Sequence, residues 1–327
     1  MFVLDSHCDT PSQILRQRDL SLDNEHAHVD FPKLRKGKVD GAFFALYVPA
    51  SLDSDPDKAF AHAVELYEGV ERTVMSNHLS VAWATDYKEA SDNKSKGLFS
   101  VFLGLENASP IDSIDKLKYF YDRGVRYVTL CHSLNNHVCD SCAPETKRWG
   151  GLSPFGKELV AEMNRLGILV DVSHVSDDTF YDVLKVSRKP VVATHSCCRS
   201  LAGHPRNMTD DMIRALAASG GVIQINFYPC FLDSGFSAVF DESDSAKCES
   251  LPRPSYRLIA DHIDHVVGLV GVDHVGIGSD YDGIEVTPDG MEDISMMPKL
   301  FEELRDRGYS EEDLEKIAGG NFFRVLG

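Results

Sequence analysis

The sequence lacks several features that indicate a function by themselves. It has no surplus of basic residues, because 33 lysines and arginines stand against 51 aspartates and glutamates, a formal net charge of −18. Such a chain repels the phosphates of nucleic acids and anionic membrane surfaces, so we expect no nucleic-acid partner. Its apolar runs, such as Gly41–Ala50, are too short to span a bilayer.

Targeting signals and a disulfide framework are also missing. The amino end has no basic segment followed by an apolar one, and no hydrophobic tail precedes Gly327. We therefore expect a cytoplasmic protein without a membrane anchor. The 8 cysteines do not form a disulfide framework in a chain of 327 residues. Cys139 and Cys142 form a lone C-x-x-C pair, and no second pair accompanies it to support a zinc or redox site.

Three motifs of common enzymes are absent. No G-x-G-x-x-G follows the first predicted strand, which argues against a dinucleotide-binding sheet. The chain also has no P-loop and no G-x-S-x-G motif, so neither a nucleotide phosphate site nor an activated serine is indicated. Hydrolysis by a water molecule that a metal activates is the simplest chemistry left for the residues described below.

The chain does contain eight strand-like runs, most of them apolar throughout. Continuous apolar runs are typical of parallel strands that are covered on both faces. The runs are Phe2–Asp9, Gly41–Val48, Leu98–Glu106, Arg126–His132, Leu169–His174, Pro190–Ser196, Gly221–Tyr228 and His274–Asp280.

Helical patterns separate these runs, and each begins with a capping residue or a proline. They are Pro56–Ser76, Ser109–Arg123, Ser153–Arg165, Thr179–Val186, Met212–Ala218, Pro254–Leu269, Met297–Arg307 and Glu311–Ala318. Alternating strands and helices predict an α/β fold, a TIM-like (β/α)₈ barrel that forms one domain over residues 1–327. A doubly wound open sheet is the alternative. Phe231–Pro254 is predicted to be a long functional loop.

Acidic residues and histidines stand at the ends of five predicted strands. The first strand ends with His7 and Asp9, whose side chains project to the same face because they are two residues apart. Glu106, His174, His195 and Asp280 each end a further strand.

The carboxyl ends of barrel strands meet at one rim, where such enzymes place their active sites. Three imidazoles and three carboxylates that converge there suit a borderline-soft divalent metal, zinc first. Each residue alone is explained equally well as an ordinary polar strand end. All six together favour a metal site.

The order of these motifs resembles the membrane dipeptidase (renal dipeptidase) family, peptidase family M19. The resemblance covers about the whole chain, which looks like a non-anchored, bacterial-type member. The matching segments are Leu4–Pro11, His28–Leu34, Gly104–Asn107, Tyr127–Ser133, Gly151–Gly156, Met163–Gly167, Asp171–Ser176, Thr194–Ser196, His204–Asn207, Asn226–Tyr228 and Gly278–Gly283.

The resemblance implies a zinc-dependent dipeptidase with two zinc ions per chain. His7, Asp9 and Glu106 would hold one ion, and Glu106, His174 and His195 the other, so that Glu106 bridges the pair. The implied reaction is the hydrolysis of a dipeptide, L-Xaa-D-Xaa included, by a bridging water.

The resemblance also assigns roles beyond the metal ligands. Asp280 resembles the acid/base that moves the proton between water and leaving amine, and His132 the residue that contacts the tetrahedral oxygen. Arg206 and Tyr228 resemble the residues that bind the terminal carboxylate of the substrate. Partners other than a small dipeptide are not implied, and a homodimer is left open.

The sequence leaves two other functions open. Another metal-dependent barrel hydrolase, such as an amidohydrolase, commonly has H-x-H on its first strand and a carbamylated lysine as bridge. The chain has His7-Cys8-Asp9 and Glu106 at these places. A catalytically inactive barrel that binds a peptide or a metal would be expected to lack Asp280 or a ligand, and all six residues are present.

Overall fold

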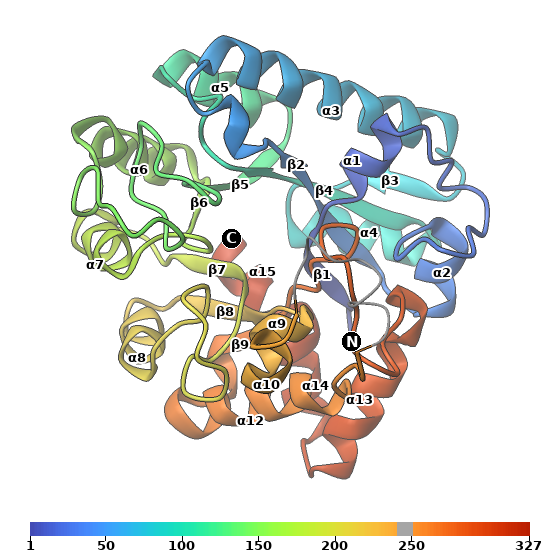
Figure 1. Ribbon diagram of the computed structural model, residues 1–327. Helices are drawn as coiled ribbons and strands as arrows, with labels where there is room; N and C mark the ends of the chain where they lie inside the picture. The colour runs from blue at the N-terminus through green and yellow to red at the C-terminus, as the bar shows by residue number, and fades with distance from the viewer. Residues whose placement is uncertain (241–250) are drawn as a thin grey trace.

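The computed structural model describes residues 1–240 and 251–327, and its parallel strands form a ring that helices surround (Figure 1). The strands are β1 (Leu4–Cys8), β2 (Gly41–Tyr47), β3 (Val81–Trp83), β4 (Phe99–Glu106), β5 (Val125–Thr129), β6 (Leu169–Asp171), β7 (Val192–Ser196), β8 (Val222–Ile225) and β9 (Val275–Ile277).

Eight of these strands lie in the order β1-β2-β4-β5-β6-β7-β8-β9 around the ring (Figure 1). The ring closes beyond the end of β9, where the Asp280 amide donates to the His7 carbonyl at 3.0 Å and the Asp9 amide to the Tyr281 carbonyl at 2.9 Å. The predicted (β/α)₈ barrel is therefore confirmed, and the open sheet was the wrong alternative.

Strand β3 is a ninth strand that the sequence did not predict. It pairs with residues 99–101 of β4, and β5 takes over the same edge of β4 from Leu103 onward. Three residues are too few to show a strand period, so a pattern search misses them.

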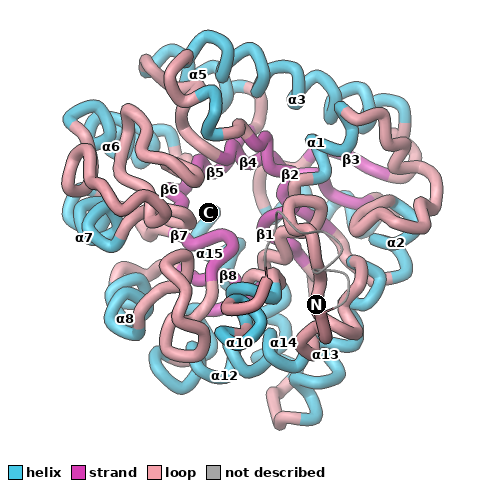
Figure 2. Tube along the Cα trace, in the orientation of Figure 1, coloured by secondary structure: helices cyan, strands magenta, loops and turns pink. Residues whose placement is uncertain are grey.

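Helices cover the outside of the ring, as their apolar stripes predict, and the last of them covers one end of the barrel (Figure 2). They are α1 (Thr10–Leu15), α2 (Phe31–Lys36), α3 (Pro56–Ser76), α4 (Tyr87–Ser95), α5 (Ile114–Asp122), α6 (Pro154–Leu166), α7 (Asp177–Val186), α8 (Asp210–Ala218), α9 (Pro229–Leu232), α10 (Ser234–Ser237), α12 (Arg257–Val270), α13 (Met297–Asp306), α14 (Glu311–Glu315) and α15 (Asn321–Leu326). Short helical turns lie at Ala50–Leu52, Val272–His274, Ile294–Met296 and Lys316–Gly320.

Capping residues fix several helix starts where the sequence predicted them. Ser153 accepts a hydrogen bond from the amide of Gly156 at the start of α6, and Thr209 caps α8 in the same way. Such caps satisfy amide groups that the helix itself leaves unpaired. The predicted loop Phe231–Pro254 is helical at its start, in α9 and α10, while residues 241–250 of that prediction lie outside the described part.

One end of the barrel is filled by the last helix. Phe322, Phe323 and Val325 of α15 belong to one apolar cluster with Tyr127, Val192 and other strand residues, and α15 lies at the centre of the ring in Figure 2. This helix therefore blocks the end of the barrel opposite the carboxyl ends of the strands (Figure 2).

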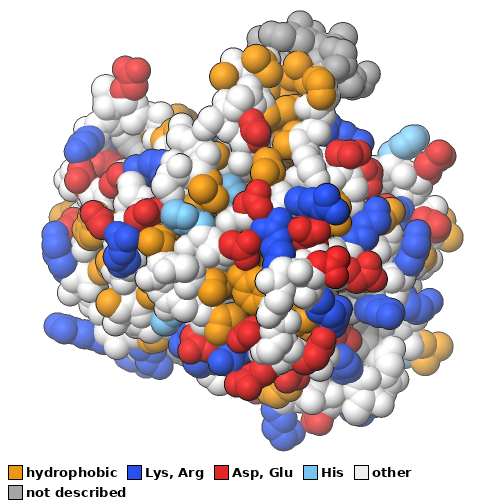
Figure 3. Space-filling model, turned by 90° about the horizontal axis from the view of Figure 1, so that it is seen from below, with side chains coloured by type: hydrophobic (Ala, Val, Ile, Leu, Met, Phe, Trp, Pro, Cys, Tyr) orange, Lys and Arg blue, Asp and Glu red, His pale blue; other side chains and the backbone are white. Residues whose placement is uncertain are grey.

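The surface carries both acidic and basic side chains, although the formal net charge is negative. On the face shown in Figure 3, acidic and basic side chains are interspersed. None of the described helices combines the length and the apolar composition that crossing a bilayer requires.

Candidate active site

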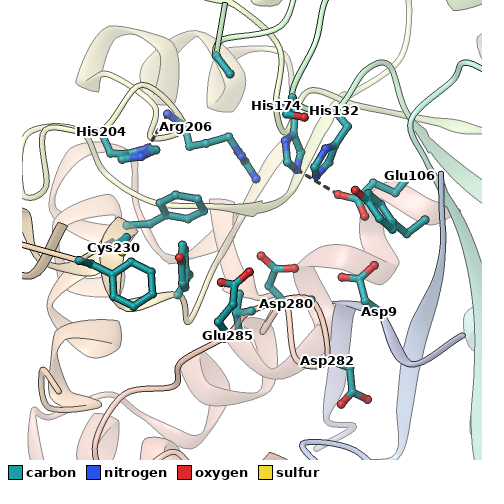
Figure 4. Close-up of a pocket in the computed structure, with 18 of the residues that line it drawn as sticks. Asp9, Glu106, His132, His174, His204, Arg206, Cys230, Asp280, Asp282 and Glu285 are labelled. Atoms are coloured by element: carbon teal, nitrogen blue, oxygen red, sulfur yellow. Dashed lines mark hydrogen bonds and ion pairs between the residues drawn. The ribbon is translucent and has the colours of Figure 1, made fainter. Parts of the chain in front are cut away.

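A pocket of about 1350 Å³ opens at the carboxyl ends of the strands. Seven of the nine predicted site residues line it, namely Asp9, Glu106, His132, His174, Arg206, Tyr228 and Asp280. All of these except Tyr228 are labelled in Figure 4. The other two, His7 and His195, are fully buried and have their ring nitrogens close to the same carboxylates. The structure thus brings together every residue that the sequence singled out.

Four of the predicted ligands lie on or directly after strands. His7 is in β1 and Asp9 follows its end, Glu106 is the last residue of β4, and His195 is in β7. Side chains of alternate residues face the barrel interior, which is why His7 and Asp9 meet while the thiol of Cys8 points to the carbonyl of Phe43 at 3.5 Å.

The fifth predicted ligand, His174, and the predicted acid/base, Asp280, lie beyond strands that end earlier than predicted. Strand β6 ends at Asp171 and β9 at Ile277, whereas the predicted runs reached His174 and Asp280. His174 and Asp280 have φ angles of 71° and 64°, in the left-handed region that few residues other than glycine adopt. Such strained conformations are concentrated at functional sites, where the surrounding structure holds them.

His132 and Tyr228 also lie outside the strands in which they were predicted. Strand β5 ends at Thr129 and β8 at Ile225, so His132 is in a loop and Tyr228 precedes α9. The His132 ring packs against His174, with ring centroids 4.3 Å apart. Burial, with Arg206 nearby, lowers the pKa of His132 to about 4, which keeps its ring neutral.

The two carboxylate oxygens of Glu106 face different histidines. Oε2 lies 3.4 Å from Nε2 of His7. Oε1 lies 3.0 Å from Nε2 of His174 and 3.4 Å from Nε2 of His195. Asp9 completes the first group, with Oδ2 3.5 Å from His7 Nε2. Two groups of three ligands therefore share Glu106.

These separations fit a metal site. Two ligands at zinc distances in a tetrahedral site are about 3.3 Å apart, and the contacts of His7 with Glu106 and Asp9 are 3.4 and 3.5 Å. Nε2 of His7 and Oδ1 of Asp9 are buried without a hydrogen-bond partner among the described residues. Buried polar atoms without partners are costly, so both favour a cation between them.

Two of the three histidines have the neutral state that metal ligation requires, whereas Glu106 and Asp9 raise the pKa of His7 against the lowering effect of burial. Burial, together with neighbouring cationic groups such as Arg206, lowers the pKa of His174 and His195 well below its usual value. Both rings are therefore neutral, as metal ligation requires. Burial, followed by the charge of Glu106, raises the pKa of Asp9 to about 6. The pocket thus crowds carboxylates together, which a divalent cation would relieve.

Asp280 lies between the two groups rather than within either. Its Oδ1 is 3.9 Å from Nε2 of His7, and its Oδ2 accepts a hydrogen bond from the Asn226 side chain at 2.8 Å. Burial raises the pKa of Asp280. A carboxylate with a raised pKa beside a metal site is suited to accept and return a proton.

Three residues to which the sequence assigned no role hold the side chains of the predicted site in place. Tyr127 Oη lies 2.8 Å from Nδ1 of His7, and Thr194 Oγ1 lies 2.9 Å from Nδ1 of His195. Asn226 is the partner of Asp280 described above. The sequence shows these three only as polar residues in or next to apolar strands. That pattern does not reveal which site residue each of them contacts.

Gly104 makes room for the Tyr127 ring. A Cβ at Gly104 would lie 2.1 Å from Cζ and 2.5 Å from Oη of Tyr127. The ring is fully buried, with Phe43 5.2 Å away, so it has little freedom to move. A glycine at this point of β4 is therefore part of the support for His7.

We expect Gly104→Ala to lower the free energy of unfolding by about 1–3 kcal/mol, because the added methyl group overpacks the barrel interior. Chemical denaturation measures the change. Gly268→Ala is the control, since Gly268 lies within α12 and, its own helix backbone and chain neighbours aside, no described atom lies within 4 Å of an added Cβ. There alanine should be neutral or stabilising. Equal stability of Gly104→Ala and the wild type would contradict the close packing.

Arg206 is held at the pocket wall by its own hydrogen bonds. Nη2 donates to the carbonyl of His195 at 2.9 Å, and Nη1 to the Ser196 hydroxyl at 3.3 Å. Its guanidinium lies over the Phe231 ring, 5.3 Å from the centroid. Nε is buried without a partner among the described residues. The guanidinium thus keeps hydrogen-bonding capacity for a ligand in the pocket.

The C-x-x-C pair has no metal-site geometry in the structure. Cys139 is fully buried, while Cys142 lines the pocket. In the described parts of the chain, neither belongs to a group of residues that could hold a metal ion.

Comparison with known proteins identifies the family. The family model described as membrane dipeptidase (peptidase family M19) matches residues 1–327. The dipeptidase aclJ of Aspergillus oryzae is 36% identical over 323 residues, which cover 97% of this chain and 73% of the relative.

Solved structures agree with this match. The probable dipeptidase PvdM of Pseudomonas aeruginosa has a TM-score of 0.87 and 26% identity, covering 100% of this chain and 95% of that one. A metallopeptidase of Rhodobacter sphaeroides, solved with a phosphinate mimic of the dipeptide L-Ala-D-Ala, has a TM-score of 0.86 and 26% identity, covering 100% and 98%. The chain belongs to the membrane dipeptidase family, peptidase family M19, and is a metallo-dipeptidase.

Proposed function

We propose that the chain is a zinc dipeptidase that holds two zinc ions and hydrolyses dipeptides, L-Xaa-D-Xaa substrates included. The observation that carries the proposal is the arrangement around Glu106, whose two oxygens face two separate groups of ligands. His7 and Asp9 would bind one ion with Glu106, and His174 and His195 the other. Imidazole and carboxylate ligands in this ratio suit zinc.

The chemistry divides between the metals and the protein. When bound, a zinc pair lowers the pKa of water and polarises the scissile carbonyl group. Asp280 takes the proton of the attacking water and returns it to the leaving amine. His132, neutral and with Nδ1 unpartnered among the described residues, donates to the oxygen of the tetrahedral intermediate.

The substrate carboxylate is assigned to Arg206 and Tyr228. A free Nε proton on a buried guanidinium favours a charged acceptor, which a dipeptide presents one residue beyond the scissile bond. The D-configuration at that residue is supported by the phosphinate mimic of L-Ala-D-Ala in the Rhodobacter sphaeroides structure.

Elemental analysis, combined with turnover of a dipeptide panel, tests the proposal. We expect about two zinc ions per chain and cleavage of both L-L and L-D pairs. A fully active protein with one metal ion would overturn the two-metal arrangement. Cleavage of long peptides as readily as dipeptides would overturn the recognition of the terminal carboxylate.

We expect Arg206→Ala to lower kcat/KM for dipeptides with a free carboxylate by about ten- to a hundredfold, since hydrogen bonds to charged groups contribute roughly 1.5–3 kcal/mol. The loss should shrink for dipeptide amides, which lack the charged acceptor. The measurement compares the loss of kcat/KM for acid substrates with the loss for amide substrates. A ratio is needed because the substitution also removes the hydrogen bond from Arg206 to the His195 carbonyl, which affects both substrates.

Arg199→Ala is the matched control for that measurement. Arg199 is a nearby arginine whose guanidinium is paired with Asp177, at 2.7 and 2.8 Å, outside the main pocket. It should leave the acid-to-amide ratio unchanged. Equal losses on acid and amide substrates in Arg206→Ala would mean that Arg206 supports the fold and does not read the carboxylate.

A further inference from the structure

We propose that Asp171 and Thr194 fix the proton of His195 on Nδ1, and thereby aim the free Nε2 lone pair at the metal that His195 shares with Glu106. Thr194 is a positioning residue in this arrangement, since it acts through His195. The inference rests on the proposed metal site, but it comes from a separate set of contacts behind the ligands.

Asp171 is surrounded by hydrogen-bond donors. Its side chain is fully buried at the end of β6. Oδ1 accepts the amide protons of Ser173 at 3.0 Å and Thr194 at 2.9 Å. Oδ2 accepts the hydroxyl protons of Thr129 at 2.6 Å and Thr194 at 2.7 Å. Four donors thus occupy about four lone-pair positions, which is the full capacity of one carboxylate.

The Thr194 hydroxyl donates its proton to Asp171. A hydroxyl carries a single proton, and that of Thr194 is used by Oδ2 of Asp171. Oγ1 also lies 2.9 Å from Nδ1 of His195, and it can only accept there. Nδ1 of His195 must therefore carry the proton.

The proton on Nδ1 determines the state of Nε2 of His195. A histidine binds a metal only as a neutral ring, which has one N–H group. With that proton on Nδ1, Nε2 is left with a lone pair, 3.4 Å from Oε1 of Glu106 and 2.9 Å from Nε2 of His174. This tautomer is the one that binds a metal through Nε2.

The arrangement has a general precedent in metal sites, where the second nitrogen of a ligating histidine commonly donates to a carboxylate or carbonyl group. Here a threonine hydroxyl stands between histidine and carboxylate. The backbone holds the ring from the other side, because the His195 amide donates to Ser173 Oγ at 3.1 Å and its carbonyl accepts from Arg206.

Thr194→Val tests the inference, since valine keeps the shape of threonine and removes only the hydroxyl. The metal-free protein is titrated with Zn²⁺ against a chromogenic chelator at fixed pH. We expect the affinity of one zinc position to fall by about 10- to 100-fold, the usual effect of losing such a partner. Thr194→Ser, which restores the hydroxyl, should bind zinc like the wild type.

Thr129→Val is a matched control. It removes a hydroxyl from the same oxygen of Asp171, in an equally buried position, without touching His195. It should leave both zinc affinities unchanged. Wild-type affinity in Thr194→Val would overturn the proposal, and so would an equal loss in Thr129→Val, because the carboxylate would then only support the barrel.

A spectroscopic measurement covers the case in which Thr194→Val does not fold. Nitrogen-15 spectra of the metal-free wild type, labelled at histidine and assigned with a His195→Gln variant, should show the proton of His195 on Nδ1. A proton on Nε2 would overturn the inference. A wild type that binds no zinc would refute the proposed function instead, and the tautomer would still be measured.

Discussion

Replacement of Asp280 by asparagine is expected to lower kcat by about 10²- to 10⁴-fold, the usual range for the loss of a general acid-base group. Asparagine cannot take the proton of the attacking water. It can still accept the hydrogen bond from Asn226, and it tolerates the left-handed backbone at this position, where φ is 64°. The fold and most of the metal content should therefore be retained, which elemental analysis and thermal unfolding would check.

Asp282→Asn is the natural comparison, because Asp282 also has a left-handed φ of 67° two residues further on. Its oxygens are occupied by the Thr10 hydroxyl at 2.9 Å and by Arg18 at 2.6 Å. We expect its turnover to stay within a few-fold of the wild type. Near-normal kcat in Asp280→Asn would place the proton transfer on another group.

The barrel itself could be predicted from the sequence because each of its strands is a buried, apolar run. All eight predicted runs overlap a strand of the ring, and α3 has the predicted bounds Pro56–Ser76. The short elements α1, α2, α4 and β3 were missed, since six residues or fewer, or a polar helix such as α4, show little periodicity. That the domain comprises residues 1–327 as one unit stays a prediction.

The predicted strands ran too long at the site, for a physical reason. The predicted runs extend through small or apolar residues to His174 and Asp280, but the strands end three residues earlier in each case. There the chain turns through left-handed backbone, which brings the side chains back over the barrel mouth. A one-dimensional pattern contains no information on such a turn unless glycine marks it.

The ligands could be recognised from sequence, but their supporting contacts could not. Acidic residues and histidines at strand ends are conspicuous in an apolar context. In contrast, Tyr127 meets His7 across 120 positions of the chain, and Thr129 meets Asp171 across 42. These pairs depend on the register between neighbouring strands, which is set by the packing of the whole ring. The roles assigned to the site residues stay predictions until the variants are measured.

Glu106→Gln is expected to remove metal from both positions and, with it, nearly all turnover. One carboxylate supplies Oε2 to the group of His7 and Oε1 to the group of His174 and His195. Glutamine offers one neutral oxygen in place of two charged ones, and its NH₂ group would turn a donor toward one of the metals. The side chain is 3% exposed, so water has little access to replace the lost ligand.

Elemental analysis after dialysis, together with zinc titration of the stripped protein, measures this loss. Glu285→Gln makes the same chemical change at an exposed position of the pocket, where Glu285 belongs to no group of described residues that could hold a metal ion, and should keep the wild-type metal content. If Glu106→Gln loses one ion and retains the other with wild-type affinity, then Glu106 belongs to one position only. In that case the contact of Glu106 with the histidines of the retained position would reflect a charge interaction between side chains, and the retained metal would be held by other ligands.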